Sequence, residues 1–255
     1  MLEKIRKVWQ HLLNRWNLRY VGLTMLISAV VIAVLGYFNQ HGNFLIPLPI
    51  VADFYANIST ELISIAITVL VIDALNERRA IQQEKENLIL QMSSPTNLIA
   101  KEAVRVLRMR GWLTDGTLKG ANLQRANLRD AFLEKADLRG IFFYEADLQG
   151  SFLQWSNLEG ARKLEDHQLA QVKYFRGAVM PDGSSYDGRF NLAGDLKWAH
   201  RSEKIAPDDH QKMANFYGVS LEEYLRGQAW AQENLLKLQN KTVVQSSEGF
   251  DTNQE

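Results

Sequence analysis

Two long apolar runs dominate the hydrophobic pattern of the first third of the chain. Residues 20–38 carry no charged side chain, and residues 54–75 form a second run that contains only two acidic residues. A helix of about 20 residues crosses roughly 30 Å of hydrocarbon, and the prolines between the runs forbid one continuous helix. The pattern predicts a two-helix transmembrane hairpin over residues 20–75.

Basic residues flank this hairpin but are absent from the segment that connects its helices. Lys and Arg are frequent in residues 1–19 and again just after the second run. Because such residues are concentrated in cytoplasmic segments, we expect both termini in the cytoplasm. Residues 1–19 also place Trp9 and Trp16 among apolar residues at helical spacing, which predicts a basic amphipathic helix on the lipid surface. A plain extension of the first span is the alternative.

The pattern then becomes charged, and we expect a helical connector and N-terminal cap over residues 76–113. The second span should continue as a helix until SSPTN, where Ser94 is a candidate N-cap for a further helix. Gly111 is a suitable end for that helix. Its apolar side is predicted to contain Leu98, Ala103, Val106 and Leu107.

From Gly116 onward the hydrophobic period is five. The repeated interior candidates are Leu118, Leu123, Leu128, Leu133, Leu138, Phe143, Leu148, Leu153 and Leu158. Small residues predominate two places before each of them, and Asn or Asp is the commonest residue between the two.

A period of five fits neither an α-helix nor a flat strand. On a helix successive leucines would lie about 140° apart, and on a strand they would alternate between faces. Residues two apart in an extended segment do share a face, so a corner between successive pairs would keep every pair inside. Four such sides would close a coil of about 20 residues, stacked at about 4.8 Å on the next coil.

The pentads ANLQR, ANLRD, AFLEK and ADLRG resemble the pentapeptide-repeat family. This resemblance implies a right-handed quadrilateral β-helix, here over residues 114–182. The fold class expected is therefore mixed: an N-terminal α-helical membrane hairpin plus this β-helix, with helical caps. The two spans, LNERR and the GWLTDG segment before the repeats also resemble membrane-anchored bacterial members of the family, which implies the bacterial inner (plasma) membrane and no established activity.

After the repeats we expect a C-terminal cap with helices over residues 183–240 and a disordered tail over residues 241–255. Ser220 and Glu223 form a capping-box pattern ahead of a helix. Phe142, Tyr144 and Trp155 lie on or near outward positions, where they mark either a partner site or packing beneath this cap.

The composition and motifs of the chain provide few candidate catalytic residues. Acidic and basic residues balance at 29 each, there is no cysteine, and the five histidines are scattered. Phosphate-binding glycine loops and a GxSxG nucleophile motif are also missing from the sequence. We therefore expect no enzyme, no cofactor and no metal site. A nucleic-acid partner is not expected, and a DNA mimic acting on topoisomerases ranks third because acids only slightly exceed bases in the repeats.

The second span carries one unusual polar face, formed by Asn57, Glu61, Ser64 and Thr68 at spacings of four, three and four. Polar residues inside a membrane usually face protein or water. The face therefore either meets its counterparts in a homo-oligomer around an ion pathway or pairs with the first span. The leading hypothesis is a membrane-anchored scaffold that contacts lipid and binds an unidentified protein partner. The alternative is a channel-like or signalling oligomer.

Overall fold

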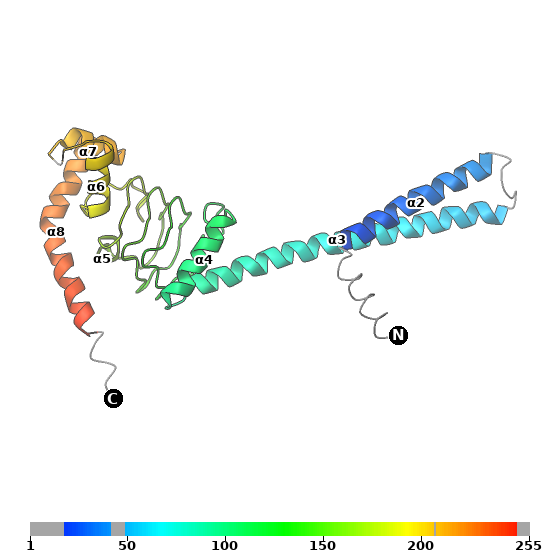
Figure 1. Ribbon diagram of the computed structural model, residues 1–255, viewed down its shortest axis with the longest axis horizontal. Helices are drawn as coiled ribbons and strands as arrows, with labels where there is room; N and C mark the ends of the chain where they lie inside the picture. The colour runs from blue at the N-terminus through cyan, green and yellow to red at the C-terminus, as the bar shows by residue number, and fades with distance from the viewer. Residues whose placement is uncertain (1–17, 42–48, 207, 249–255) are drawn as a thin grey trace, which may run out of the picture. The chain divides into compact units, whose positions relative to one another are not determined.

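The computed structural model describes three stretches of the chain: residues 18–41, 49–206 and 208–248 (Figure 1). The amphipathic helix predicted over residues 1–19 therefore lies almost wholly outside the described residues. The chain divides into two compact units, and the division falls between Gln83 and Glu84. Each unit is described by itself.

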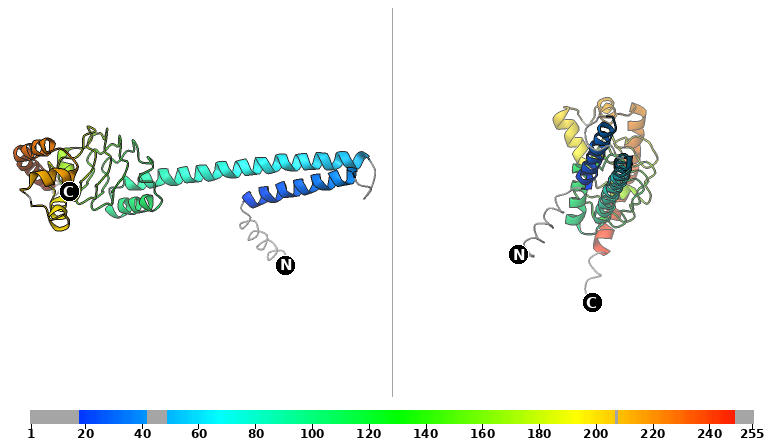
Figure 2. Two further views of the ribbon diagram at one scale, coloured as in Figure 1. Left: turned by 90° about the horizontal axis from the view of Figure 1, so that it is seen from above. Right: turned by 90° about the vertical axis from the view of Figure 1, so that its right-hand side faces the viewer.

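The first unit is a pair of helices, α2 (Leu18–His41) and the first part of α3 (Pro49–Met92), which lie side by side in Figures 1 and 2. Small residues bring the two backbones close together. Ala29 and Ala66 are fully buried, and a Cβ on Gly22 would lie only 2.7 Å from the Leu70 side chain. Close approach of this kind lets helices pack without a hydrophobic driving force between them.

By length and composition alone, both helices are able to cross a membrane, over Arg19–Phe38 and within Asn57–Met92. Most of their apolar side chains point outward, among them Ile27 and Val71. Arg19 of α2 joins two acids of α3: its guanidinium lies 3.2 Å from the Asp73 carboxylate and also pairs with Glu77.

The second unit begins with the last turns of α3, where Met92 is fully buried. Helix α4 (Asn97–Met109) follows, and its N-cap is Thr96, not Ser94 as predicted. The Ser94 hydroxyl instead accepts a hydrogen bond from the Thr96 N–H, which makes a turn before the helix begins. The predicted apolar side was partly wrong, since Leu98 is 79% exposed and the buried residues are Ala100, Ala103, Val104 and Leu107.

The segment around α4 closes the first edge of the repeats. The Asn97 side chain donates hydrogen bonds to the backbone carbonyls of Asn127 and Arg129, at 3.2 and 2.9 Å. The Asn127 N–H donates to the Ser94 carbonyl, and the Asp137 N–H donates to the Leu113 carbonyl. These bonds occupy backbone groups that would otherwise present an open edge.

The repeats form a coil of turns, which we call the repeat coil, over residues 118–180. The prediction of a right-handed quadrilateral β-helix is wrong for the described residues, because no strand or sheet forms in them and every named element is a helix. Successive turns of the coil are joined by isolated parallel bridges between residues 20 apart, such as Asn122 with Phe142 and Phe132 with Phe152.

The corners explain why no strand forms. Each corner is a tight hydrogen-bonded turn of the backbone. At one corner, for example, the Ala126 N–H donates to the Leu123 carbonyl at 3.1 Å. The residue before the end of that turn takes a positive φ, such as 57° at Arg125 and 59° at Lys135. A corner after every fifth residue leaves one bridged residue on each side of the coil, whereas a strand needs consecutive paired residues.

The last turn of the coil is longer than the first two. Tyr174 bridges Phe152 at a spacing of 22, because the short helix α5 (Asp166–Leu169) is inserted before it. The Gln168 side chain is buried here and donates to the carbonyls of Phe143 and Ala146, at 3.1 and 2.6 Å. An amide side chain thus supplies donors where the regular repeat is interrupted.

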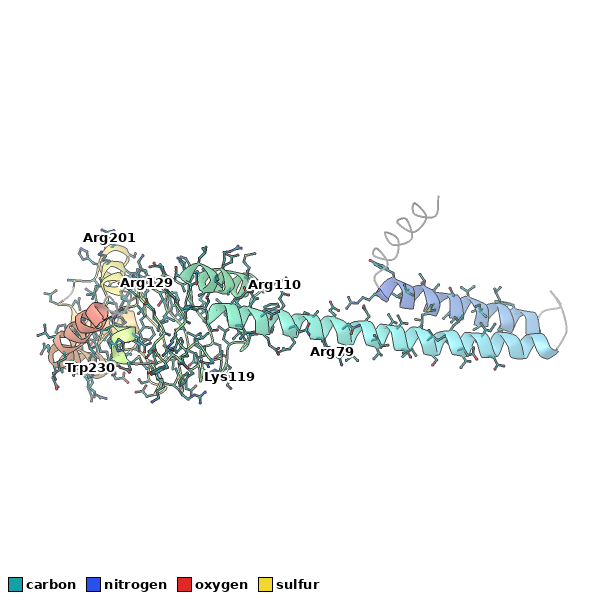
Figure 3. All side chains as sticks on the ribbon, turned by 90° about the horizontal axis from the view of Figure 1, so that it is seen from below. Arg79, Arg110, Lys119, Arg129, Arg201 and Trp230 are labelled. Atoms are coloured by element: carbon teal, nitrogen blue, oxygen red, sulfur yellow. The ribbon has the colours of Figure 1, made fainter. Side chains whose placement is uncertain are left out.

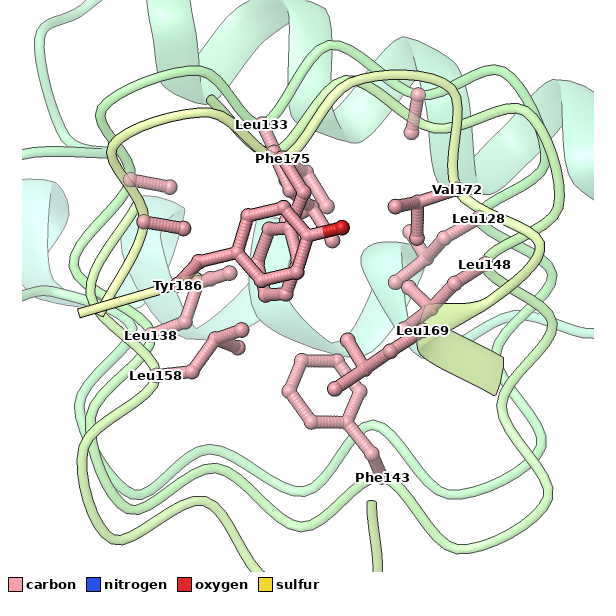
Figure 4. Close-up of a cluster of buried hydrophobic side chains, with 14 of the residues drawn as sticks. Leu128, Leu133, Leu138, Phe143, Leu148, Leu158, Leu169, Val172, Phe175 and Tyr186 are labelled. Atoms are coloured by element: carbon pink, nitrogen blue, oxygen red, sulfur yellow. The ribbon is translucent and has the colours of Figure 1, made fainter. Parts of the chain in front are cut away.

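Three further helices follow: α6 (Ala193–Ser202), α7 (His210–Tyr217) and α8 (Leu221–Glu248). The capping box is present, since Ser220 and Glu223 exchange hydrogen bonds of 2.8 and 3.2 Å. Helix α8 extends to Glu248, past the point where the sequence predicted a disordered tail to begin. Tyr186 is fully buried at this end of the coil and packs against Phe175, with ring centroids 4.7 Å apart (Figure 4).

Candidate interaction surfaces

The interior of the repeat coil is filled with side chains. The nine interior candidates all lie within it, and none is more than 1% exposed. Figure 4 shows part of this interior, with side chains such as Leu128, Phe143 and Leu158 converging from the sides of the coil and Tyr186 across its axis. Burial of each leucine is worth about 1.5–3 kcal/mol, so this interior stabilises the fold and leaves no room for a ligand.

Most outward polar residues of the repeats are used locally. The Asn122 side-chain oxygen accepts from the Gln124 N–H at 3.0 Å, and Asn157 does the same with the Glu159 N–H at 2.9 Å. Such bonds fix a turn and leave the side chain less free to recognise a partner.

Charged residues on the outer faces also pair with one another. Arg125 and Glu145 lie 2.7 Å apart on neighbouring turns of the coil, and Arg139 lies 2.6 Å from Asp137. The hydrogen bond from Arg139 lowers the pKa of the Asp137 carboxyl below its ordinary value. This pairing neutralises much of the surface charge of the repeats, which agrees with the equal numbers of acidic and basic residues in the sequence.

The polar face of the second span lies away from its partner helix. All four of its side chains (Asn57, Glu61, Ser64 and Thr68) are exposed, whereas Ser59 and Ala66 of the same helix are buried. The Thr68 hydroxyl donates to the Ser64 carbonyl at 2.9 Å. Within this hairpin, pairing with the first span therefore does not account for the polar face.

Asp195 closes the far end of the repeat coil. Its carboxylate is fully buried in the first turn of α6 and accepts a hydrogen bond of 3.2 Å from the Phe175 N–H. Burial raises the pKa of Asp195 to about 7, against the lowering effect of the backbone donors at Phe175 and Arg176. The adjoining Gly194 lies so close to the coil that a Cβ would sit 2.0 Å from the Lys173 carbonyl oxygen. Asp195 thus belongs to the packing of the cap.

One outer face carries a row of aromatic rings, which we call the ladder face: Phe132, Phe152, Tyr174 and Trp198. The ring centroids of Phe132 and Phe152 are 4.5 Å apart, those of Phe152 and Tyr174 are 5.4 Å apart, and Trp198 of α6 continues the row at 6.1 Å. Phe132 is 48% exposed and the other three are half-buried. Sequence reasoning missed this row, although the spacing of 20 between Phe132 and Phe152 was a sufficient signal.

The other outward aromatic residues have mixed surroundings. Trp155 meets Trp198 of the C-terminal cap edge to face, with centroids 5.7 Å apart, and is still 43% exposed. Tyr144 is 40% exposed and packs against Phe142 on a different face. Packing beneath the cap therefore accounts for Trp155 in part and for neither Phe142 nor Tyr144.

Among the described residues, no group of three or more acidic or histidine side chains is arranged to hold a metal ion.

Comparison with known proteins matches the repeats to a family. The sequence profile of the family "Pentapeptide repeats" matches eight copies over residues 113–143 and 121–162. No curated protein and no solved structure matches the chain. The match indicates a protein-interaction or structural role of the kind that is general in this family, whose members are for the most part not enzymes. Residues 113–162 are therefore pentapeptide repeats of that family.

Proposed function

We propose that the chain is a non-enzymatic scaffold that presents its repeat coil to a protein partner at the cytoplasmic surface of a bacterial inner membrane. The observation that carries the proposal is the filled interior, combined with aromatic side chains exposed on the outside. Phe132, Tyr144 and Trp155 are each at least 40% exposed. A surface of this kind suits recognition of another macromolecule better than conversion of a small one.

Anchoring in lipid is the second part of the proposal. Two helices with the length and composition of membrane spans precede the repeat coil. Basic residues flank them on both sides and are absent between them, which favours cytoplasmic termini and a cytoplasmic repeat coil. The pairing of Arg19 with Asp73 lies at the end of α2 where we place the cytoplasmic boundary of the bilayer.

Site-specific photocrosslinking in living cells tests both parts. A photoreactive amino acid at Phe132 should give a discrete crosslinked protein, and the same group at Gln124, an exposed position on another face, should not. The full chain should stay in the membrane fraction after alkaline extraction. Identical crosslinks from both positions would refute a specific surface, and release by alkali would refute the anchor.

The exposed polar face of α3 favours one alternative function, a homo-oligomer whose polar faces meet around an ion pathway. A carboxylate such as Glu61 is costly in contact with lipid, and a second copy would supply a polar surface for it. Mass measurement in mild detergent and ion flux in liposomes separate the two functions. An oligomer whose flux falls on Glu61→Gln would favour the channel. A monomer without flux would remove it and leave the scaffold standing.

A further inference from the structure

The ladder face combines ring edges with cations. Lys173 Nζ lies 4.8 Å from the Phe152 ring centroid and 5.7 Å from that of Tyr174, and the Arg108 guanidinium lies 5.7 Å from the Phe132 centroid. Phe132 and Phe152 stack on each other and each has a cation over its ring, so the edges of these two rings are the part left for a partner. Aromatic edges carry partial positive charge and attract anions.

Two hollows flank the row, one beside Phe132 and one along the other three rings. The first, beside Phe132, is lined by Lys101, Arg105 and Arg108 of α4. The second has a volume of about 460 Å³ and is lined by Phe152, Tyr174, Trp198, Lys197 and Arg201, among others. No carboxylate lines either hollow.

Acidic neighbours offset only part of this charge. Glu102 pairs with Arg105, and Glu134 lies 3.7 Å from Arg108. Within the described part of the chain, Lys101, Lys173, Lys197 and Arg201 form no ion pair. The ladder face is therefore an electropositive surface in a chain whose overall charge is zero.

Gln154 adds an independent observation. This residue also lines the second hollow, and its side-chain oxygen is buried with no hydrogen-bond partner among the described residues. A buried polar atom without a partner is costly, and rotation of the Gln154 amide toward the hollow would let its oxygen accept from the backbone N–H of a bound peptide.

The chemistry of the ladder face favours an extended acidic peptide over single-stranded nucleic acid and over a bilayer surface. Single-stranded nucleic acid binds by stacking bases on ring faces, and here the Phe132 and Phe152 rings stack on each other. A bilayer surface is broad, whereas the cations here surround two separate hollows. An extended acidic peptide fits both the row of ring edges and the cations at its ends.

We propose that the ladder face binds an extended, acidic segment of a partner protein, with carboxylates at Lys101, Lys197 and Arg201 and backbone at Gln154. The inference rests on the proposed scaffold function and names the chemistry of its partner.

The test uses the full chain in phosphatidylcholine nanodiscs and a fluorescein-labelled peptide of alternating glutamate and serine, read by fluorescence anisotropy. We expect binding that weakens with salt and falls about tenfold or more in the double variant Lys197→Glu/Arg201→Glu. The matched control is Lys119→Glu/Lys163→Glu, which changes the net charge equally at two exposed positions. Lys119 and Arg201 project from different sides of the second unit (Figure 3).

Equal loss in both double variants, or no binding of the peptide, would overturn the proposal. Tighter binding of oligothymidylate would assign the face to nucleic acid instead. If phosphatidylserine in the nanodisc abolished peptide binding, the face would belong to lipid. Failure of the peptide with persistent crosslinks from Phe132 would leave the scaffold function intact, whereas loss of both would remove it.

Discussion

Replacement of a corner glycine measures the conformational cost of the coil directly. Gly140 has φ of 67°, and the nearest atom to an added Cβ would be the Gly120 Cα at 3.8 Å, an ordinary contact. Gly140→Ala therefore adds no clash, only a left-handed backbone for alanine, which costs roughly 1–2 kcal/mol. Alanine also lowers the conformational entropy of the unfolded chain relative to glycine, which stabilises the folded state by about 0.4–1 kcal/mol. We expect a net loss of about 1 kcal/mol of unfolding free energy.

Gly150→Ala supplies the comparison. Its φ of 70° is nearly the same, but the new Cβ would lie 2.3 Å from the Asp130 carboxylate oxygen. The Asp130 side chain must rotate away, so this substitution should cost more than Gly140→Ala. In an Asp130→Ala background the extra cost should disappear, which makes the pair a double-mutant cycle.

Urea unfolding of the intact chain in mild detergent, followed by tryptophan fluorescence, gives the free energies. A loss of 1 kcal/mol corresponds to about 2–4 °C in Tm for a unit of this size. The reasoning fails if Gly140→Ala is neutral or stabilising, or if the cost of Gly150→Ala does not depend on Asp130.

Three other predictions concern the interior, the cap and the hairpin. Leu138→Lys places an unpaired charge in the filled interior and should abolish cooperative unfolding, whereas Arg139→Ala at the surface should not; equal melting curves would contradict this. Because burial raises the pKa of Asp195 above its ordinary 3.8 to about 7, the folded chain holds an extra proton between these values. Stability should therefore fall from pH 5 to 7, by up to about 1.4 kcal/mol per unit, and Asp195→Asn should flatten that slope in urea titrations. If the α3 polar face mediates assembly, Glu61→Gln should reduce the mass measured in detergent; an unchanged mass would argue against that interface.

The hydrophobic period predicted the interior and the corners of the coil correctly, but the backbone pairing inferred from it was wrong. A period of five requires a corner every five residues, and positive φ values recur at that interval, as at Arg125, Asp130 and Lys135. A strand needs consecutive paired residues, and the prediction did not take into account that corners this close leave one paired residue on each side. One paired residue on each side yields isolated bridges, so the predicted β-helix was wrong.

Other features depend on contacts between distant segments. Tyr174 joins the ladder face only because α5 lengthens the third turn of the coil, and Trp198 joins it from a helix beyond the repeats. The burial of Asp195 likewise depends on how closely Gly194 approaches the coil. None of these three relations has a local signal in the sequence. The outward direction of the α3 polar face could not be predicted either, because the face shows which residues lie together and not which side α2 occupies.

The positions within each repeat differ in their roles, and this difference bears on the proposed binding by the ladder face. The third residue of a repeat fills the interior and the fifth makes the corner, while the second residue carries the bridge between neighbouring turns of the coil. Where it is Asn or Asp, as at Asn122 and Asn157, it closes its own turn with a hydrogen bond. Phe132 and Phe152 have no side-chain oxygen to accept this hydrogen bond, and they leave aromatic surface exposed to solvent. Phe142 is a third phenylalanine at this position of the repeat, but it lies on another face of the coil. Phe132 and Phe152 stack on each other and lie between two hollows lined by cations. Their alignment is consistent with the proposed binding of a partner at this face.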